Sequence, residues 1–279
     1  MPSSKMKSVQ ARHLCWFLAI LLALLFNGCA GKQPWTTSQV AEEEAAFLRQ
    51  TFEEMQQLDA SCFSSLDAEA TLVWEGPGSN RSIAGFFQLM LPTSVKFVVL
   101  NPLGQPLYAL VSDGREFQSI NTSLKQHTIG KISTLAAQYQ IPASLLSDDW
   151  GYWLTGRLHE HRATIEAIRR DGSGRGIWLT LRYQGASNLP KNHLLIQPES
   201  KQLLTRILVD HQGETVATIS YDQRRGEEAC SPLSRITISD LPYRSQLTID
   251  FTDILTDRSF TTANFRLKVP ADFTTQELH

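Results

Sequence analysis

The sequence predicts an α+β fold, an incomplete antiparallel β-barrel of about 10–11 strands whose concave apolar face is covered by helices. Three observations predict it. An amphipathic helical segment precedes residue 60, many short segments then alternate apolar and polar residues, and a second helical segment interrupts them near residues 133–156. A sheet with that many strands tends to curl, and helices on its inner face would leave a half-open barrel.

The chain begins with a basic segment followed by an apolar run. Lys5, Lys7 and Arg12 precede residues 15–26, a stretch of 12 residues without a polar side chain. A transmembrane helix needs about 20 residues, so this run is too short to span a bilayer. The pattern is typical of a secretory signal peptide.

The segment Asn27-Gly28-Cys29-Ala30 follows the apolar run directly. It resembles the lipobox of bacterial lipoproteins, in which the cysteine becomes the acylated N-terminus. The resemblance implies a signal peptide over 1–28, lipidation of Cys29 with acyl chains such as palmitate, and, because residue 30 is not Asp, a periplasm-facing place on the outer membrane. The alternatives are a secreted protein with an incidental Cys29 and an uncleaved anchor.

The charge balance argues against a nucleic-acid partner. The chain holds 26 basic and 28 acidic residues, and removing 1–28 takes away three basic residues and no acid, which leaves a net charge of −5. General nucleic-acid binders normally have a clear basic excess. Attraction to anionic lipid is also not expected to hold such a chain on a membrane.

Two cysteines, Cys62 and Cys230, remain after the signal peptide and the lipidation site are set aside. In an oxidising compartment two thiols can pair. The sequence does not show whether the two backbones approach closely enough, so a disulfide and two separate thiols both stay open.

The mature chain reads as a short tether over 29–36 and one domain over 37–279. Ser38 precedes an acidic and then apolar segment that predicts a capped amphipathic helix of about twenty residues. The apolar positions of this helix recur every three or four residues: Val40, Ala45, Phe47, Leu48, Phe52, Met55 and Leu58.

After this helix the apolar period changes to two, which indicates an antiparallel meander with one apolar face. Residues 171–176, DGSGRG, lack the lysine of a phosphate-binding loop and are expected to form a hairpin turn. The segment 133–156 predicts one or two short helices. The strand positions include Leu72, Trp74, Phe87, Leu89, Phe97, Val99, Leu179, Leu181, Ile207, Ile236, Ile249, Phe251, Phe265, Leu267 and Val269.

Three features together resemble the Lol lipoprotein-localisation proteins. Residues 98–110, VVLNPLGQPLYAL, resemble the strand–loop–strand of the receptor LolB, and 141–156, IPASLLSDDWGYWLTG, resemble its Trp-x-x-Gly helix. The lipobox is the third feature. Residues 247–273, LTIDFTDILTDRSFTTANFRLKVPADF, look more like the closing strands of the carrier LolA, so the chain resembles the wider LolA/LolB-like superfamily.

This resemblance implies an apolar cavity for acyl chains and a loop that presents a leucine to the membrane. By position that residue is Leu103, on a turn between Pro102 and Gly104. The alternative is that Leu103 folds back into the core. The residues expected to line the cavity are Trp74, Phe87, Leu89, Phe97, Val99, Trp150, Trp153, Leu179 and Leu181.

Other constellations in the sequence are weak signals for chemistry. His159 and His161 have the spacing of a metal-binding pair but no evident third ligand, and Asp148-Asp149 are expected to cap a helix. No nucleophile motif is present in the sequence, so we expect neither an enzyme nor a cofactor.

The function expected is binding of lipid or acylated protein and its delivery to the outer membrane, with the acyl chains and a periplasmic carrier protein as partners. The alternative is a sensor or envelope-assembly lipoprotein that recognises a lipid or protein partner on the same fold without transfer. Fold alone does not separate the two.

Overall fold

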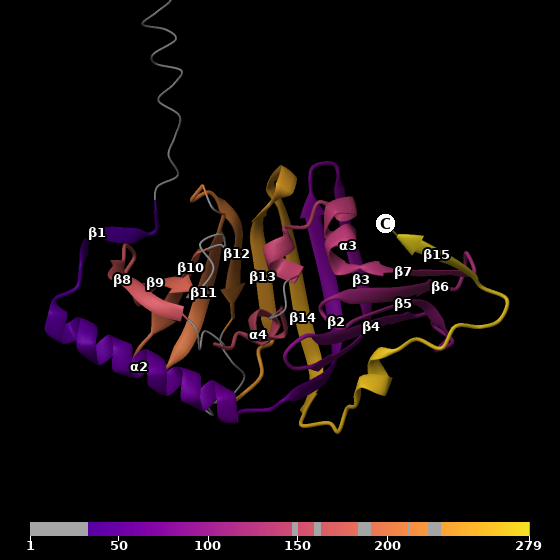
Figure 1. Ribbon diagram of the computed structural model, residues 1–279, viewed down its shortest axis with the longest axis horizontal. Coiled ribbons are helices and arrows are strands. Elements are labelled where there is room, and N and C mark those ends of the chain that lie inside the picture. Colours follow the sequence, from indigo (N-terminus) through magenta and orange to yellow (C-terminus); the bar gives the residue numbers. More distant parts are fainter. Residues whose placement is uncertain are drawn as a thin grey trace, which may run out of the picture. The chain divides into compact units, whose positions relative to one another are not determined.

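Fifteen strands form one continuous sheet in the computed structural model (Figure 1). The structure describes residues 33–146, 150–158, 163–183, 191–210, 212–222 and 230–278. The unit described begins at Trp35, and the expected signal peptide and Cys29 lie outside the described residues. The strands are β1 (Trp35–Gln39), β2 (Ser65–Gly76), β3 (Ser79–Met90), β4 (Ser94–Leu100), β5 (Pro106–Ser112), β6 (Glu116–Asn121), β7 (Gln126–Lys131), β8 (Ala163–Asp171), β9 (Ile177–Tyr183), β10 (Lys191–Gln197), β11 (Gln202–Val209), β12 (Thr215–Tyr221), β13 (Arg235–Leu241), β14 (Ser245–Thr256) and β15 (Thr274–Leu278).

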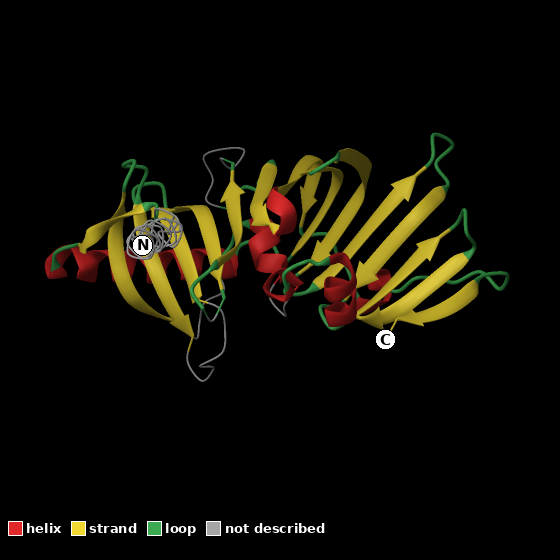
Figure 2. Ribbon diagram, turned by 90° about the horizontal axis from the view of Figure 1, so that it is seen from above, coloured by secondary structure: helices red, strands yellow, loops and turns green. Residues whose placement is uncertain are grey.

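The strand order is β1-β8-β9-β10-β11-β12-β13-β14-β2-β3-β4-β5-β6-β7-β15. Nearly all neighbours are antiparallel, as predicted, and β15 alone among the described strands pairs in parallel, with β7. The edge strands β1 and β15 lie far apart and do not pair, so the barrel stays open (Figure 2). The α+β class and the incomplete barrel are confirmed.

The strand number exceeds the predicted 10–11, and the ends of the sheet differ from expectation. β1 occupies residues 35–39, so Ser38 is a strand residue and does not cap the helix, and the segment expected as a tether ends earlier than residue 36. The strand expected over 265–269 is wrong. Phe265 ends a short 3-10 helix, η3 (Thr262–Phe265), and is buried beside Phe260, with ring centroids 5.8 Å apart.

Helix α2 (Glu42–Ser61) starts after Ala41, which makes no side-chain cap. Its apolar face belongs to the same core as the alternate, inward residues of β9 and β10, and Leu179 pairs with Leu194 in that register. Two ion pairs tie its exposed side to the sheet. Glu44 lies 2.6 Å from Arg170, and Glu54 lies 2.9 Å from Lys201.

Three shorter helices complete the inner side, α3 (Ile132–Tyr139), η1 (Ala143–Leu146) and α4 (Trp150–Thr155). They fall within the segment 133–156 that predicted one or two helices, with α3 starting one residue earlier. Within the part of the chain that the structure describes, no helix combines the length and the apolar character that a membrane span requires.

The β8–β9 hairpin at 171–176 is held by one carboxylate. Asp171 is buried and accepts hydrogen bonds from Ser173, from Arg175 and, at 2.8 Å, from the Trp178 indole. Burial opposes ionisation of this carboxyl, but the hydrogen bonds from Ser173, Arg175 and Trp178 outweigh it and hold its pKa far below the ordinary value. The DGSGRG segment is therefore a structural turn.

The Asp171→Asn variant is expected to lower the free energy of unfolding at neutral pH by about 1–3 kcal/mol, because the charged hydrogen bonds are lost. Since the folded-state pKa is depressed, this stabilisation is present above the unfolded pKa, about 3.9, and is lost as the pH falls toward the folded value. Urea unfolding of both proteins from neutral to acid pH checks this. A difference between them that does not shrink on acidification would contradict it.

Candidate functional site

A helical lid, defined here as α3, η1 and α4, covers the inner face of the sheet near β13, β14 and β2 (Figure 1). Its α4 end is fixed to the β3–β4 turn. The Gly151 N–H donates to the Pro92 carbonyl at 3.0 Å, and the Trp150 indole donates to the Thr93 carbonyl. A Cβ on Gly151 would lie 2.3 Å from the Pro92 oxygen, so this close approach requires glycine.

The lid and the sheet enclose an apolar pocket of about 160 Å³. Its sheet side includes Trp74, Ile238 and Leu247, which are register neighbours on β2, β13 and β14. The Trp153 indole donates to the Leu145 carbonyl at 2.9 Å, so this lid residue presents apolar ring atoms rather than an unsatisfied N–H. The full lining is Trp74, Tyr139, Gln140, Ile141, Pro142, Leu145, Leu146, Trp153, Ile238, Leu241, Pro242, Tyr243, Ser245 and Leu247.

Beyond the lid the inner face of the sheet continues as an apolar strip. Leu72 pairs with Ile83 in register, and Ile83 is exposed. Tyr108 lies farther along, on β5. Burial raises its pKa, a hydrogen bond with Ser119 opposes that rise, and the nearby Tyr139 adds to it, which places the α3 end of the lid beside β5.

The structure divides the predicted cavity residues into three groups. Trp74 and Trp153 line the pocket. Phe97 and Val99 are half-buried on β4, and Trp150 is buried where the lid meets the sheet. The remaining four are core residues rather than pocket lining, because other side chains enclose them: Phe87, Leu89, Leu179 and Leu181.

The pocket also uses residues that the sequence did not single out. Tyr139 and Ile141 come from the end of α3, where Gln140 adopts the left-handed backbone conformation that stops the helix. Pro142 then directs the chain toward η1. On the other side, Pro242 and Tyr243 come from a turn between β13 and β14. For Tyr139 and Ile141 the sequence did offer a signal, because they stand just before Pro142 and a proline commonly follows the end of a helix.

A larger hollow of about 440 Å³ lies at the β15 edge. Its lining includes Glu116, Lys131 and Glu277 beside Phe117 and Leu278. Charged groups of both signs make it a poor environment for an apolar chain, whose transfer from water requires apolar surroundings. The smaller pocket under the lid is therefore the better candidate site.

Leu103 stands on the tip of a tightly bonded turn between β4 and β5. The Asn101 side-chain oxygen accepts hydrogen bonds from the backbone N–H groups of Leu103 and Gln105, each at 2.9 Å. Gly104 has a positive φ of 78° in this turn. Leu103 is 84% exposed, so the alternative in which it folds back into the core is wrong.

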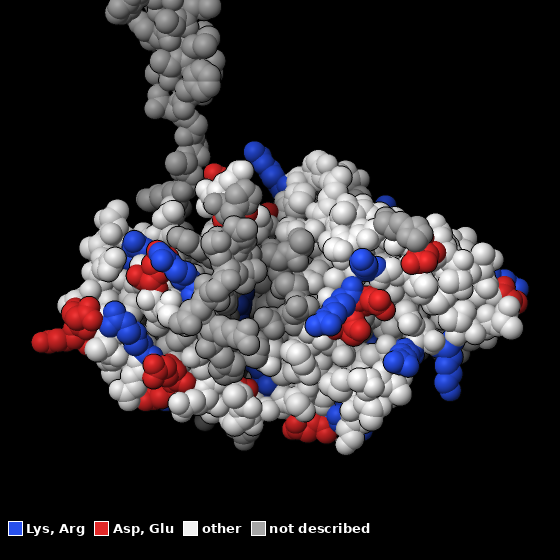
Figure 3. All heavy atoms as spheres, in the orientation of Figure 1, with Lys and Arg blue, Asp and Glu red and all other residues white. Residues whose placement is uncertain are grey.

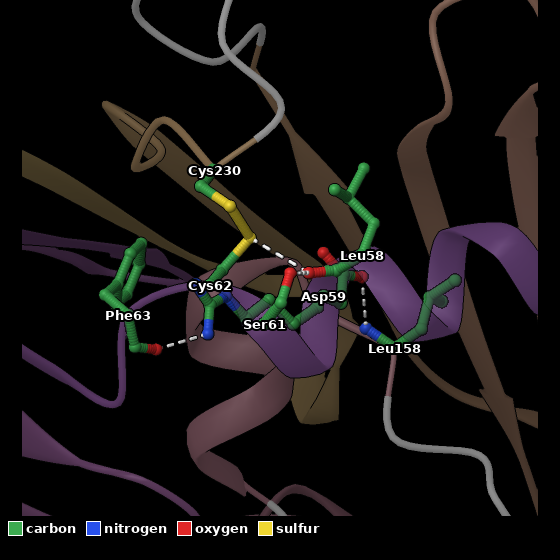
Figure 4. The surroundings of a disulfide bond; sticks show 8 residues. Leu58, Asp59, Ser61, Cys62, Phe63, Leu158 and Cys230 are labelled. Carbon is green, nitrogen blue, oxygen red and sulfur yellow. Dashed lines mark hydrogen bonds between the residues drawn. A yellow bond between two sulfur atoms is a disulfide. The ribbon is translucent and has the colours of Figure 1, made fainter.

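A disulfide joins Cys62, just after α2, to Cys230 before β13 (Figure 4). The two Cα atoms are 5.3 Å apart. Beside it the Asp59 carboxylate accepts a hydrogen bond from the Leu158 N–H at 2.9 Å, which ties α2 to the chain leaving the lid. The Arg157 guanidinium lies 3.7 Å above the centre of the Phe63 ring.

The other chemical constellations that the sequence offered fall in parts of the chain that the structure does not describe. They are His159 with His161, and Asp148-Asp149. Within the part of the chain that the structure describes, no group of three metal-ligating side chains comes together. The pocket under the lid is described by its apolar lining.

No protein-family model matches the sequence, and no curated protein matches it significantly. Solved structures do resemble the fold. A LolA superfamily protein from Nitrosomonas europaea matches 78% of this chain and 97% of its own, with 13% identity and a TM-score of 0.51. A DUF1329 family protein from Desulfovibrio piger matches 78% and 96%, with 9% identity and a TM-score of 0.56.

A third similar structure is a putative outer membrane lipoprotein-sorting protein domain from Vibrio parahaemolyticus. It covers 77% of this chain and 94% of its own, with 8% identity and a TM-score of 0.51. At these identities the similarity concerns the fold. The chain therefore has the LolA/LolB-like fold that its sequence motifs predicted.

Proposed function

We propose that this protein is an envelope lipoprotein that binds an acyl chain of a lipid or of an acylated protein and delivers it to the outer membrane. The observation that carries the proposal is the apolar pocket between the lid and the sheet. Its volume of about 160 Å³ is similar to that of an apolar cavity, roughly 150 Å³, that takes up benzene. Such a pocket fits one end of an acyl chain. The apolar strip on the inner face of the sheet, from Leu72 and Ile83 toward Tyr108, would accommodate the rest.

The surroundings of the pocket support acyl chains over polar ligands. The lining side chains are mostly aliphatic and aromatic, and Tyr139, a lining residue at the end of α3, is exposed. Both ends of the lid are anchored in the core, α3 through Ile132 and Ala136 and α4 through Trp150, so a chain would enter beside the exposed Tyr139 between them. Moderate affinity is enough, because delivery requires the chain to prefer the membrane to the pocket.

The fold similarity to a lipoprotein-sorting domain supports a place in the cell envelope. Attachment through acyl chains at Cys29 remains part of the proposal. The residues 29–279 carry a net charge of −5, and basic and acidic side chains lie intermingled on the face drawn in Figure 3. Electrostatic attraction to anionic lipid is weak for such a surface, which favours an acyl anchor.

The test is to purify the chain from residue 30 onward under mild detergent-free conditions and to identify bound small molecules by mass spectrometry. We expect acyl chains that are absent from a matched preparation of an unrelated periplasmic protein. A protein that carries none, and that takes none from fatty-acid micelles, would overturn the proposal.

Leu103 supports delivery as a membrane-inserting residue, because an exposed leucine on a rigid turn can enter the surface of a bilayer. The Leu103→Glu variant is expected to bind acyl chains like the native protein but to release them to vesicles about tenfold more slowly, since an ionised carboxylate resists insertion. Transfer of a fluorescent fatty acid to vesicles measures the rate. Leu124→Glu, on the neighbouring β6–β7 turn and also exposed, is the matched control. A native transfer rate for Leu103→Glu would show that this turn has no part in delivery.

A further inference from the structure

The turn between β13 and β14 has an unusual backbone. Within five residues, Asp240, Tyr243 and Arg244 have positive φ angles of 58°, 61° and 56°. Side chains with a Cβ seldom adopt this left-handed conformation, because of steric cost, and such residues concentrate at functional sites. The Ser245 hydroxyl donates to the Pro242 carbonyl at 2.6 Å and holds the turn, η2 (Pro242–Arg244), in this form.

This turn displays an aromatic side chain at the mouth of the pocket. Tyr243 lines the pocket together with Leu241 and Pro242, yet it is 71% exposed. A residue that is part of the lining and open to solvent marks the entrance. Trp74 and Tyr139 also line this pocket and are also exposed, so three of its aromatic lining residues are open to solvent.

The length of the N-terminal segment limits where a membrane can lie. If Cys29 carries the acyl anchor, five residues, 30–34, separate it from Trp35, where β1 begins. An extended chain of that length spans at most about 20 Å. Strand β1 and the β13–β14 turn both lie toward the top of Figure 1, whereas α2 lies along the lower side.

The chemistry of the turn suits a bilayer surface. Tyrosine places its ring among acyl chains and its hydroxyl among head groups, which is why it is common at membrane interfaces. The neighbouring Arg244 is exposed and can approach lipid phosphate. Both side chains come from the turn that forms the pocket entrance.

We infer that the β13–β14 turn contacts the bilayer through Tyr243, so that the pocket mouth opens directly onto the membrane. An acyl chain would then pass between bilayer and pocket without crossing water. The inference rests on the proposed function and goes beyond it, because it assigns the orientation of the protein and the residue at the entrance.

The test uses the chain from residue 30 with a histidine tag in place of Cys29, bound to phosphatidylethanolamine–phosphatidylglycerol vesicles through nickel-chelating lipid. A polarity-sensitive fluorophore is attached at Tyr243→Cys, and its quenching by brominated lipid is measured. The control is the same fluorophore at Leu255→Cys, which is exposed at the other end of β14, roughly 40 Å away along the strand.

We expect a blue shift and strong loss of emission at position 243, with neither change at 255. Equal quenching at both positions, or quenching at 255 alone, would overturn the inference, as would a 243 fluorophore that stays in water. Uptake of a fatty acid from micelles by the untagged native protein is measured separately. If the protein takes up no fatty acid, the proposed function is refuted. If it takes up fatty acid but position 243 does not contact the bilayer, only the orientation is refuted.

Discussion

The Leu247→Trp variant is expected to lose acyl-chain binding by at least about tenfold, which corresponds to roughly 1.4 kcal/mol. Leu247 lies half-buried on the inner face of β14, in register with Trp74, and lines the pocket. A tryptophan there would fill much of a space of about 160 Å³. Because the space is open rather than packed, the added ring need not cause the strain of overpacking. Titration with a fluorescent fatty acid measures the loss.

The matched control for this variant is Thr248→Trp. Residue 248 is the next on the same strand and is also half-buried, but its side chain points to the opposite face of the sheet. It is expected to bind fatty acid like the native protein. If both variants bind equally well, the ligand does not occupy the pocket under the lid.

Removing the disulfide is expected to have the largest effect on stability. Cys62 and Cys230 are 168 residues apart in the sequence, and a cross-link that closes a loop of this size stabilises a fold by about 3–5 kcal/mol. The double variant Cys62→Ser/Cys230→Ser should unfold at a correspondingly lower urea concentration. The bond also holds the end of α2 close to the start of β13. Its loss should therefore loosen the packing of α2 near β13, one of the strands that line the pocket.

The native protein treated with a reducing agent is the control, because it keeps both cysteines but lacks the bond. It should resemble the double variant. A double variant as stable as the oxidised native protein would mean that the cross-link constrains the unfolded chain far less than its loop size implies.

The inner strands of the sheet could be predicted because they bury one face. Ile236, Ile249 and Phe251 keep a strict period of two and are buried on the inner side. The edge strands carry no such signal. β1 and β15 are largely exposed, and their sequences, WTTSQ and TTQEL, contain few apolar residues, so pairing with β8 and β7 rather than burial of a face defines them.

The pocket was harder to predict than the sheet, since a residue's inward direction does not tell whether it meets a space or another side chain. Leu179 and Trp74 both point inward. α2 packs against the sheet at Leu179 and leaves no space, whereas the lid stands off the sheet at Trp74. This difference depends on where α2 and the lid dock, and for α2 and Leu179 the residues involved are more than a hundred positions apart in the sequence.

The left-handed backbone conformation of the turn at Tyr243 had no detectable sequence signal. Pro242 indicates a turn, but the positive φ angles of Asp240, Tyr243 and Arg244 follow from the closure of a short connection between two paired strands. Leu103, in contrast, was predictable, because the Asn-Pro-Leu-Gly sequence specifies a tight turn with one apolar residue.

The most direct test of acyl-chain binding is photolabelling with a fatty acid that carries a diazirine near the end of its chain, followed by peptide mass spectrometry. The pocket under the lid predicts labels on lining residues such as Trp74, Ile141, Trp153 and Leu247, with competition by unlabelled fatty acid. Labels confined to the outer face of the sheet or to the hollow near Glu116 and Lys131, or labelling that unlabelled fatty acid does not reduce, would contradict it.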